Sequence, residues 1–267
     1  MITIATRLAT LAWNSPRIML HSAYSAFDAW PHAKQLPRSW RALPVFCITT
    51  KGAIRRHRVL GKQIKRLGFD SFEYVFGPEI GIDDLADLEA QGIYDSAEAL
   101  KYHKRPLRPA EISCSLAHGL AYEKIASQGV ERALIIEDDA LFIGRRFELI
   151  DLDNLPGRFD VVMINSERLP RQPTDGAGTH LYGSASYVAS ACAYLVSKNG
   201  AETLKRVYKP VIHAADGLLG RCMVHHGSEK HPFKGEGARG AIETFLVAPD
   251  LVLNGSCDYY YNSLIRR

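Results

Sequence analysis

The chain has 267 residues, of which 46% are hydrophobic and 23% are charged, and its formal net charge is +4. This ordinary globular composition excludes a disordered chain, a collagen-like fibre and a small domain that depends on disulfides. No stretch approaches the roughly 18 consecutive apolar residues that a membrane-spanning helix needs, so an integral membrane protein with several spans is also excluded.

The basic excess lies at the start of the chain. Residues 1–41 hold five basic side chains against one acid, which accounts for the whole net charge, and they also hold all three Trp. The remainder is formally neutral, so a nucleic-acid-binding surface is not indicated and no nucleic-acid partner is expected. Five cysteines occur without a CxxC pair, which favours reduced thiols over a zinc knot or a disulfide framework and indicates a cytosolic protein.

Two regions are predicted: a basic, Trp-containing extension over 1–41 and a folded domain over 44–267, with a linker over 37–44. Within the extension, apolar side chains recur at helical spacing on one face, at Leu20, Ala23, Phe27 and Trp30. Such a face, bordered by Trp and Arg, suits contact with a membrane surface. Two alternatives stay open, a helix that packs on the body of the same protein and a targeting peptide.

Beyond the linker, strand and helix patterns alternate. Strands are predicted over 45–49, 72–76, 133–136, 159–164, 191–196, 244–247 and 251–253, the last two closing the sheet. Helices are predicted over 52–67, 83–90, 109–127, 197–204 and 216–224, and a Gly- and charge-rich loop over 228–240. This alternation predicts an α/β fold with a mainly parallel central sheet and helices on both faces.

Three consecutive acids, Glu137, Asp138 and Asp139, follow the buried strand over 133–136. In an extended chain Glu137 and Asp139 point to one side and Asp138 to the other. Ligands of open α/β sheets bind at the carboxyl ends of the strands, and paired carboxylates with room for water and phosphate suit Mg²⁺ or Mn²⁺. The alternative is an acidic turn that caps the next element.

A second cluster lies on the helix predicted to begin at Pro109, a residue suited to the first helical position. Polar side chains form one stripe on this helix: Glu111, Ser115, His118 and Tyr122. Glu111 and His118 are candidates for chemistry. Taken singly, each has a structural alternative, because an acid in the first turn opposes the helix dipole and a lone buried histidine is usually structural.

The order of these two blocks resembles glycosyltransferase family 25, the lipopolysaccharide and lipooligosaccharide glycosyltransferases related to the collagen galactosyltransferases. The matching blocks are Arg-Pro-Ala-Glu-Ile-Ser-Cys-Ser-Leu-Ala-His over 108–118 and Leu-Ile-Ile-Glu-Asp-Asp-Ala over 134–140. Two further blocks, over 193–204 and 209–216, extend the similarity to about residues 44–255. The resemblance implies a GT-A-type nucleotide-sugar-binding fold and transfer from a UDP-sugar with inversion. It also implies that Glu137 and Asp139 stand where such enzymes carry an Asp-x-Asp metal motif.

This resemblance places further residues. Arg55, Arg56 and Arg58 follow the first strand, where the nucleotide would sit, and Arg pairs well with phosphate, so they join 137–139 as candidate donor-binding residues. The alternative is the solvated face of a helix. The Gly-x-Gly-x-x-Gly run over 235–240 has no strand before it, which favours a loop near the diphosphate over a Rossmann turn. A histidine could complete the metal shell, from His225, His226 or His231.

The sequence is therefore interpreted as a metal-dependent inverting hexosyltransferase. It would move a sugar, of the galactose type, from a UDP-sugar to a lipopolysaccharide or other glycan acceptor, with Mn²⁺ or Mg²⁺ between Glu137, Asp139 and the diphosphate. Asp216 is the leading candidate for the base that deprotonates the acceptor hydroxyl, with Glu111 and His118 as alternatives. The structural alternative for Asp216 is the N-cap of the helix that follows it.

The expected setting is the cytoplasm, with peripheral contact of residues 1–41 at the inner face of the cytoplasmic membrane, where lipid-linked glycan acceptors lie. Two other functions stay open. A divalent-metal phosphohydrolase could use the same acids. A non-catalytic relative that binds nucleotide or glycan would fit the departures from the family pattern over 49–52 and at Ile212.

Overall fold

The structure is a computed structural model that describes residues 35–165, 180–183, 190–223 and 242–256. Its centre is a seven-stranded sheet in the order β2-β1-β3-β7-β5-β8-β6. In that order the strands are Ser71–Phe76, Pro44–Thr49, Arg132–Glu137, Ala193–Ser197, Val161–Met163, Thr244–Val247 and Leu181–Gly183. Only β7 and β6 run against their neighbours, so five of the seven strands share one direction.

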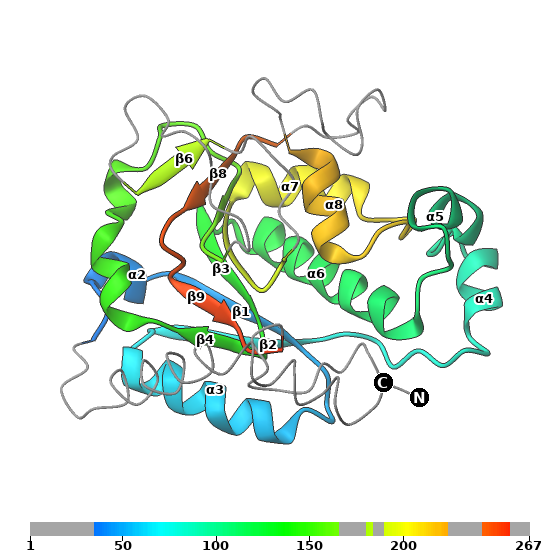
Figure 1. The fold of residues 1–267 in the computed structure, drawn as a ribbon, viewed down its shortest axis with the longest axis horizontal. Helices are drawn as coiled ribbons and strands as arrows, with labels where there is room; N and C mark the ends of the chain where they lie inside the picture. The colour runs from blue at the N-terminus through cyan, green and yellow to red at the C-terminus, as the bar shows by residue number, and fades with distance from the viewer. Residues whose placement is uncertain (1–34, 166–179, 184–189, 224–241, 257–267) are drawn as a thin grey trace, which may run out of the picture.

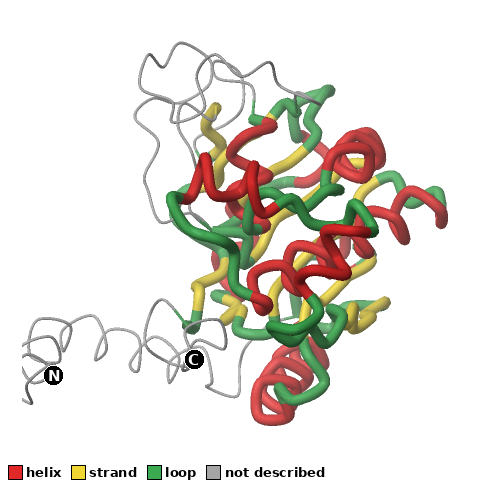
Figure 2. Tube along the Cα trace, turned by 90° about the vertical axis from the view of Figure 1, so that its right-hand side faces the viewer, coloured by secondary structure: helices red, strands yellow, loops and turns green. Residues whose placement is uncertain are grey.

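The helices lie on both faces of this sheet, with α3 on one side and α6, α7 and α8 on the other (Figures 1 and 2). Their bounds are Arg38–Arg41 (α2), Ile54–Leu67 (α3), Leu85–Ala90 (α4), Ser96–His103 (α5), Pro109–Gln128 (α6), Lys198–Val207 (α7) and Ala215–Cys222 (α8). Short 3₁₀ helices cover Gly144–Leu149 and Leu152–Asn154. The predicted α/β class, with a mainly parallel sheet covered on both faces, is confirmed.

The strand sequences explain this layering. Successive side chains of a strand point to opposite faces, and the central strands are apolar at nearly every position, as strands buried on both faces must be. In β3, Ala133 and Ile135 pack in the core beneath α6, whereas Leu134 and Ile136 pack in the core beneath α3. By this alternation Glu137, the last residue of β3, faces α6.

Three expectations need correction. The strand predicted over 251–253 does not close the central sheet, because β9 (Val252–Asn254) pairs with β4 (Ala140–Phe142) in a separate two-stranded sheet. Helix α5 was not predicted; its signal was Asp95, whose carboxylate accepts the Glu98 N–H at 2.8 Å and caps the first turn. The predicted linker over 37–44 instead contains α2 and the start of β1.

The residues around α2 belong to the folded body. Trp40 is fully buried, donates its indole N–H to the Ile150 carbonyl at 3.1 Å, and packs edge-on against Phe147. Leu36 is buried in the same core. The body therefore begins before the predicted boundary at residue 41. The rest of the predicted extension lies outside the described residues.

No helix in the described ranges has both the length and the apolar character needed to cross a membrane.

The start of α7 packs so closely on the sheet that only glycine fits at position 200. A Cβ atom there would lie 2.3 Å from the backbone oxygen of Asp160. We expect Gly200→Ala to destabilise the protein by about 1–3 kcal/mol, because backbone atoms must shift to remove the overlap. Urea unfolding measures the change. The control is Gly157→Ala, where a Cβ meets nothing within 4 Å; equal midpoints for the two variants would contradict the prediction.

Candidate functional site

The candidate site lies at the carboxyl ends of β1 and β3, which are adjacent and parallel. Ile48 is the register partner of Glu137, and the Asp138 N–H donates to the Ile48 carbonyl at 3.1 Å. β3 ends at Glu137, and Asp138 and Asp139 form a turn before β4. The extended-chain alternation therefore stops at Glu137, and it does not set the directions of the two aspartates as the sequence argument assumed.

Asp138 is the anchor of a buried polar cluster on the α3 side. Arg56 donates from Nη1 to Asp138 Oδ1 at 2.6 Å, and both side chains are almost fully buried. The Thr49 hydroxyl lies 2.6 Å from Asp138 Oδ2 and 2.6 Å from His57 Nε2. Because the ion-paired carboxylate can only accept, Thr49 donates to Asp138 and accepts from the His57 ring N–H. These contacts hold the Arg56 side chain near the carboxyl ends of β1 and β3.

Asp139 lies beside the same guanidinium, with Arg56 Nη1 3.7 Å from its Oδ2. The Cys192 thiol is 3.7 Å from its Oδ1. Burial, followed by the negative charge of Glu137, raises the pKa of Asp139 to about 6, although Ser256 and Arg56 act in the opposite direction. In the described part of the chain, the ion pairs of Asp138 and Asp139 are both with Arg56, so two carboxylates face one guanidinium.

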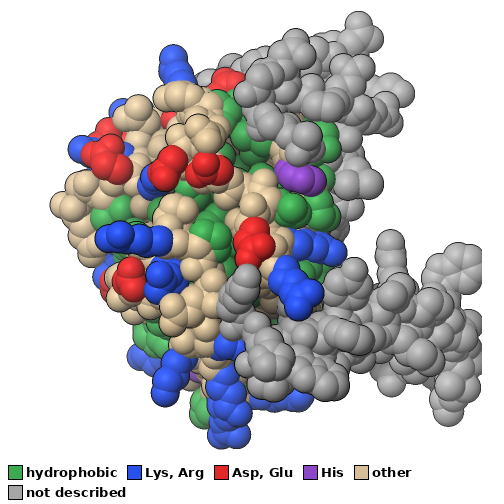
Figure 3. Space-filling view, turned by 90° about the vertical axis from the view of Figure 1, so that its left-hand side faces the viewer, with side chains coloured by type: hydrophobic (Ala, Val, Ile, Leu, Met, Phe, Trp, Pro, Cys, Tyr) green, Lys and Arg blue, Asp and Glu red, His purple; other side chains and the backbone are tan. Residues whose placement is uncertain are grey.

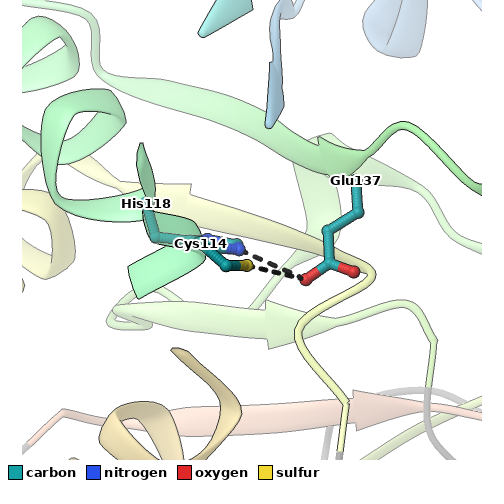
Figure 4. Close-up of side chains that lie close together, drawn as sticks. All are labelled: Cys114, His118 and Glu137. Atoms are coloured by element: carbon teal, nitrogen blue, oxygen red, sulfur yellow. Dashed lines mark hydrogen bonds and ion pairs between the residues drawn. The ribbon is translucent and has the colours of Figure 1, made fainter. Parts of the chain in front are cut away.

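Glu137 turns the other way, toward α6. Its Oε1 lies 3.4 Å from His118 Nε2 and 3.8 Å from Cys114 Sγ, as Figure 4 shows. His118 is fully buried, stacks on Tyr194, and places Nδ1 2.7 Å from the Tyr194 hydroxyl. Glu137 and Asp139 therefore have different immediate partners, and their predicted role as a metal pair stays a prediction.

A cavity of about 90 Å³ opens between these groups. Its lining includes Thr49, Arg56, Cys114, Glu137 and Asp138. Gly77, which directly follows β2, and Ser113, on α6, also line the cavity. They approach so closely that a Cβ on Gly77 would lie 2.6 Å from the Ser113 hydroxyl oxygen. The structure thus brings three of the predicted donor-binding residues, Arg56, Glu137 and Asp138, to one opening, and their role in binding stays a prediction.

The other two predicted arginines are placed differently. Arg55 and Arg58 are exposed, whereas Arg56, between them, is buried. Together with Lys62 and Lys65 they form an exposed basic stripe along α3, and Lys and Arg gather at the lower edge of the face in Figure 3, where α3 lies. The structure therefore favours the solvated-face interpretation for Arg55 and Arg58.

Glu111 has partners that hold the start of α6. Arg105 donates to both of its carboxylate oxygens, at 2.7 and 2.6 Å, and the Arg108 N–H donates at 2.8 Å. Burial raises the pKa of Glu111, but these hydrogen bonds outweigh it and the net shift is downward. A carboxylate held in this way is a weak base, so the contacts favour a structural role.

The polar stripe predicted on α6 faces the interior of the protein, because Ser115 and Tyr122 are buried with His118.

Asp216 lies in the first turn of α8, but it is not the N-cap, which is Ala214. Its carboxylate accepts the N–H of Gly217 at 2.8 Å. Burial raises the pKa of Asp216 and the charge of Glu137 adds to the effect, while the Gly217 hydrogen bond opposes it. Asp216 therefore senses the charge of Glu137, at the acidic end of β3. A raised pKa suits a general base.

The structure adds Thr49, His57, Cys114 and Tyr194 to the site, all of which the sequence analysis missed. Two local signals could have found some of them. Thr49 ends a strand next to the acidic strand end, and Cys114 precedes His118 by one helical turn. His225, His226, His231 and the loop predicted over 228–240 lie outside the described residues.

The carboxylates at this strand end are chemically suited to the divalent metal that the sequence predicts. Two of the three acids at this strand end, Asp138 and Asp139, are buried beside Arg56, and repulsion by the charge of Glu137 adds to burial in raising the pKa of Asp139. A divalent cation would relieve this repulsion, and carboxylate oxygens are the ligands that Mn²⁺ and Mg²⁺ prefer. Glu137 and Asp139 are the residues that the sequence predicts would hold it.

A histidine cluster lies between α5 and the start of α8. His213 Nδ1 is 3.2 Å from His103 Nε2, and Arg221 Nη1 is 3.1 Å from His213 Nε2. Burial, then the charges of Arg221 and His103, lowers the pKa of His213 to about 3. His213 is therefore neutral in the folded protein at pH values where an unfolded histidine is charged.

This cluster predicts a pH dependence of stability. The folded pKa of His213 lies below the unfolded value of about 6.5, so its contribution is complete above pH 6.5 and is lost as the pH falls toward 3. We expect His213→Gln to flatten the decline of the unfolding free energy between pH 6.5 and pH 4.5, measured by urea unfolding. His180→Gln, at a partly buried histidine elsewhere, is the control; parallel curves for wild type and His213→Gln would contradict the prediction.

Comparison with known proteins gives a consistent set of relatives. The family model described as glycosyltransferase family 25 (LPS biosynthesis protein) matches residues 42–219. A glycosyltransferase 25 family member of Aedes aegypti is 28% identical over 167 residues, which are 60% of this chain and 27% of that protein. Procollagen galactosyltransferase 1-B of Xenopus laevis is 29% identical over 182 residues, 64% of this chain and 29% of that protein.

The chain thus spans less than a third of the length of these two relatives. Among solved structures, a glycosyltransferase involved in the glycosylation of the major capsid of PBCV-1 aligns with a TM-score of 0.34 and 14% identity, over 62% of this chain and 65% of that one.

Proposed function

The chain belongs to glycosyltransferase family 25, and from this membership we propose that it is an inverting glycosyltransferase that moves a galactose-type sugar from a UDP-sugar to a glycan acceptor. The names of the procollagen galactosyltransferases among its relatives support the sugar. The observation that carries the proposal is the opening at the ends of β1 and β3, where Arg56 and Glu137 line one cavity.

Arg56 is the donor-binding residue that the geometry supports best. The Asp138 carboxylate accepts a hydrogen bond from its guanidinium, and the Thr49 hydroxyl in turn donates to that carboxylate. A guanidinium that is fixed before binding loses little entropy when it pairs with a phosphate. Glu137 and Asp139 would hold Mn²⁺ or Mg²⁺, which when bound supplies positive charge to offset the diphosphate leaving group.

Asp216 is the proposed base. Its carboxylate oxygen would take the proton of the acceptor hydroxyl as that oxygen attacks the anomeric carbon. Its burial and raised pKa support this role, whereas Glu111 is bound by Arg105 and has a lowered pKa. His118 is enclosed between Tyr194 and Glu137, a position better suited to orienting Glu137.

The acceptor proposed is a lipopolysaccharide or another glycan, in keeping with the description of the family. We propose that the first part of the predicted extension over 1–41, residues 1–34, which holds three basic side chains against one acid, contacts the membrane surface near a lipid-linked acceptor. Binding to anionic vesicles by the full chain, lost at high salt, is the expected result.

A thermal-shift screen of nucleotide sugars with and without Mn²⁺ tests the donor. A UDP-sugar that binds the folded state should stabilise it by about 2.7 kcal/mol at a concentration 100 times its Kd. The stabilisation should require Mn²⁺ and should be greatest for UDP-galactose. Absence of any shift with UDP-sugars would refute the proposal, and release of the sugar at one rate with or without acceptor would indicate a hydrolase instead.

A further inference from the structure

Cys114, His118 and Glu137 form a compact set of three different ligand types. Cys114 and His118 lie one turn apart on α6, and Glu137 reaches them from the end of β3 (Figure 4). Their ligand atoms all lie within 4.8 Å of one another. Sulfur, nitrogen and oxygen donors from two rigid elements thus converge on one point.

Two of the three separations between these ligand atoms are close to those around a small tetrahedral ion. Zinc bonds of about 2.0 Å to nitrogen and oxygen and about 2.3 Å to sulfur place ligand atoms about 3.3–3.6 Å apart. The observed separations are 3.4 Å from His118 Nε2 to Glu137 Oε1 and 3.8 Å from Cys114 Sγ to the same oxygen. Both values lie within a few tenths of an ångström of the tetrahedral range, and the Cys114 and His118 ligand atoms lie within 4.8 Å of each other.

The surroundings of His118 orient it for such a role. Its Nδ1 is held by the Tyr194 hydroxyl at 2.7 Å, and that hydroxyl is 2.8 Å from the Tyr122 hydroxyl. When Nδ1 donates to Tyr194, the Nε2 lone pair points at the cluster. A hydrogen bond from the second ring nitrogen is the usual support of a metal-binding histidine.

The chemical types of the three ligand atoms, and their access to solvent, indicate which metal ion the site would bind. A thiolate and an imidazole favour zinc-like cations over Mg²⁺ or Mn²⁺, which prefer oxygen. Cys114 and Glu137 also line the cavity at the strand ends, so a fourth coordination position can open to solvent. On binding, the sulfur–metal bond replaces the S–H bond and the thiol proton passes to water.

We propose that Cys114, His118 and Glu137 bind a thiophilic divalent cation such as Zn²⁺, at a site that overlaps the oxygen-ligand pair of the proposed transferase only at Glu137. The two sites share Glu137, so zinc at this site competes with Mn²⁺ for that carboxylate. The zinc site itself does not depend on the proposed function, and its test uses no sugar donor.

The experiment is titration of the purified full chain with Co²⁺, a spectroscopic substitute for Zn²⁺. We expect a sulfur-to-cobalt charge-transfer band in the wild type that Zn²⁺ displaces. Cys114→Ser should lose the band, and the matched control Cys192→Ser, at the buried thiol beside Asp139, should keep it. Absence of the band in the wild type, its persistence in Cys114→Ser, or its loss in Cys192→Ser would overturn the proposal.

Two further measurements keep the test decisive if Cys114→Ser folds poorly. In the wild-type protein, Zn²⁺ should slow alkylation of Cys114, read by mass spectrometry; an unchanged rate would overturn the proposal. Tyr194→Phe removes the hydroxyl that holds His118 but leaves all three ligands. We expect Zn²⁺ affinity to fall about 10- to 100-fold in this variant, and unchanged affinity would remove Tyr194 as a positioning residue.

Discussion

Asp139→Asn is expected to abolish Mn²⁺-dependent binding of a UDP-sugar while the fold stays intact. The amide keeps the volume of the carboxylate but loses its charge, and a neutral oxygen is a much weaker ligand for a hard cation. The fold should survive because the backbone contact of this residue, from the Gly255 N–H to the Asp139 carbonyl at 2.9 Å, is unaffected. Arg56 also keeps its close partner, Asp138, at 2.6 Å.

Isothermal titration of Mn²⁺ and UDP-galactose into the variant measures the effect, with urea unfolding as the check on folding. Asp153→Asn is the matched control: it makes the same change of charge at a side chain that is 72% exposed, and donor binding should stay at the wild-type level. If Asp139→Asn binds metal and donor like the wild type, the acids form only an acidic turn and the metal assignment is wrong.

Asp216→Asn is expected to lower turnover by about 10²- to 10⁴-fold, the usual cost of removing a general base. The amide cannot take a proton, but it can still accept the Gly217 N–H, which now spans 2.8 Å to the carboxylate. Helix α8 should therefore begin as before. Donor binding should survive, because Asp216 is not one of the proposed metal or phosphate ligands.

Turnover with saturating donor and acceptor is the measurement, and Glu111→Gln is the informative comparison. Glu111 receives hydrogen bonds from Arg105 and from the Arg108 N–H, so its substitution should lower stability and leave turnover of the folded protein nearly unchanged. A rate for Asp216→Asn within about threefold of the wild type would remove Asp216 from the mechanism. A large loss of rate in Glu111→Gln would promote Glu111 in its place.

Local sequence was sufficient for much of the fold. The apolar runs at 45–49 and 133–136 became β1 and β3, because strands buried on both faces must be apolar at nearly every position. Pro109 and the Gly129 terminus, with φ of 66°, delimit α6 as local rules predict. Three acids after a buried strand also pointed to the end of the sheet where the candidate site lies.

The arrangement within that site depended on contacts that no local pattern reveals. Of three neighbouring arginines, only Arg56 is buried against Asp138, a partner 82 positions away in the chain. The turn after Glu137 separated Glu137 from Asp138 and Asp139, which sequence alternation had treated as continuous with the strand.

Sequence alone therefore determined the α/β class, the main elements and the chemical character of the acidic strand end, because periodicity and caps act within a few residues. Tertiary structure decided which side chains meet. Trp40 is buried in the core, and β9 pairs with β4 outside the central sheet. Cys114 lies beside His118 and Glu137. The physical reason is that burial and ion pairing depend on packing between distant segments, and the local helix and strand patterns do not record that packing.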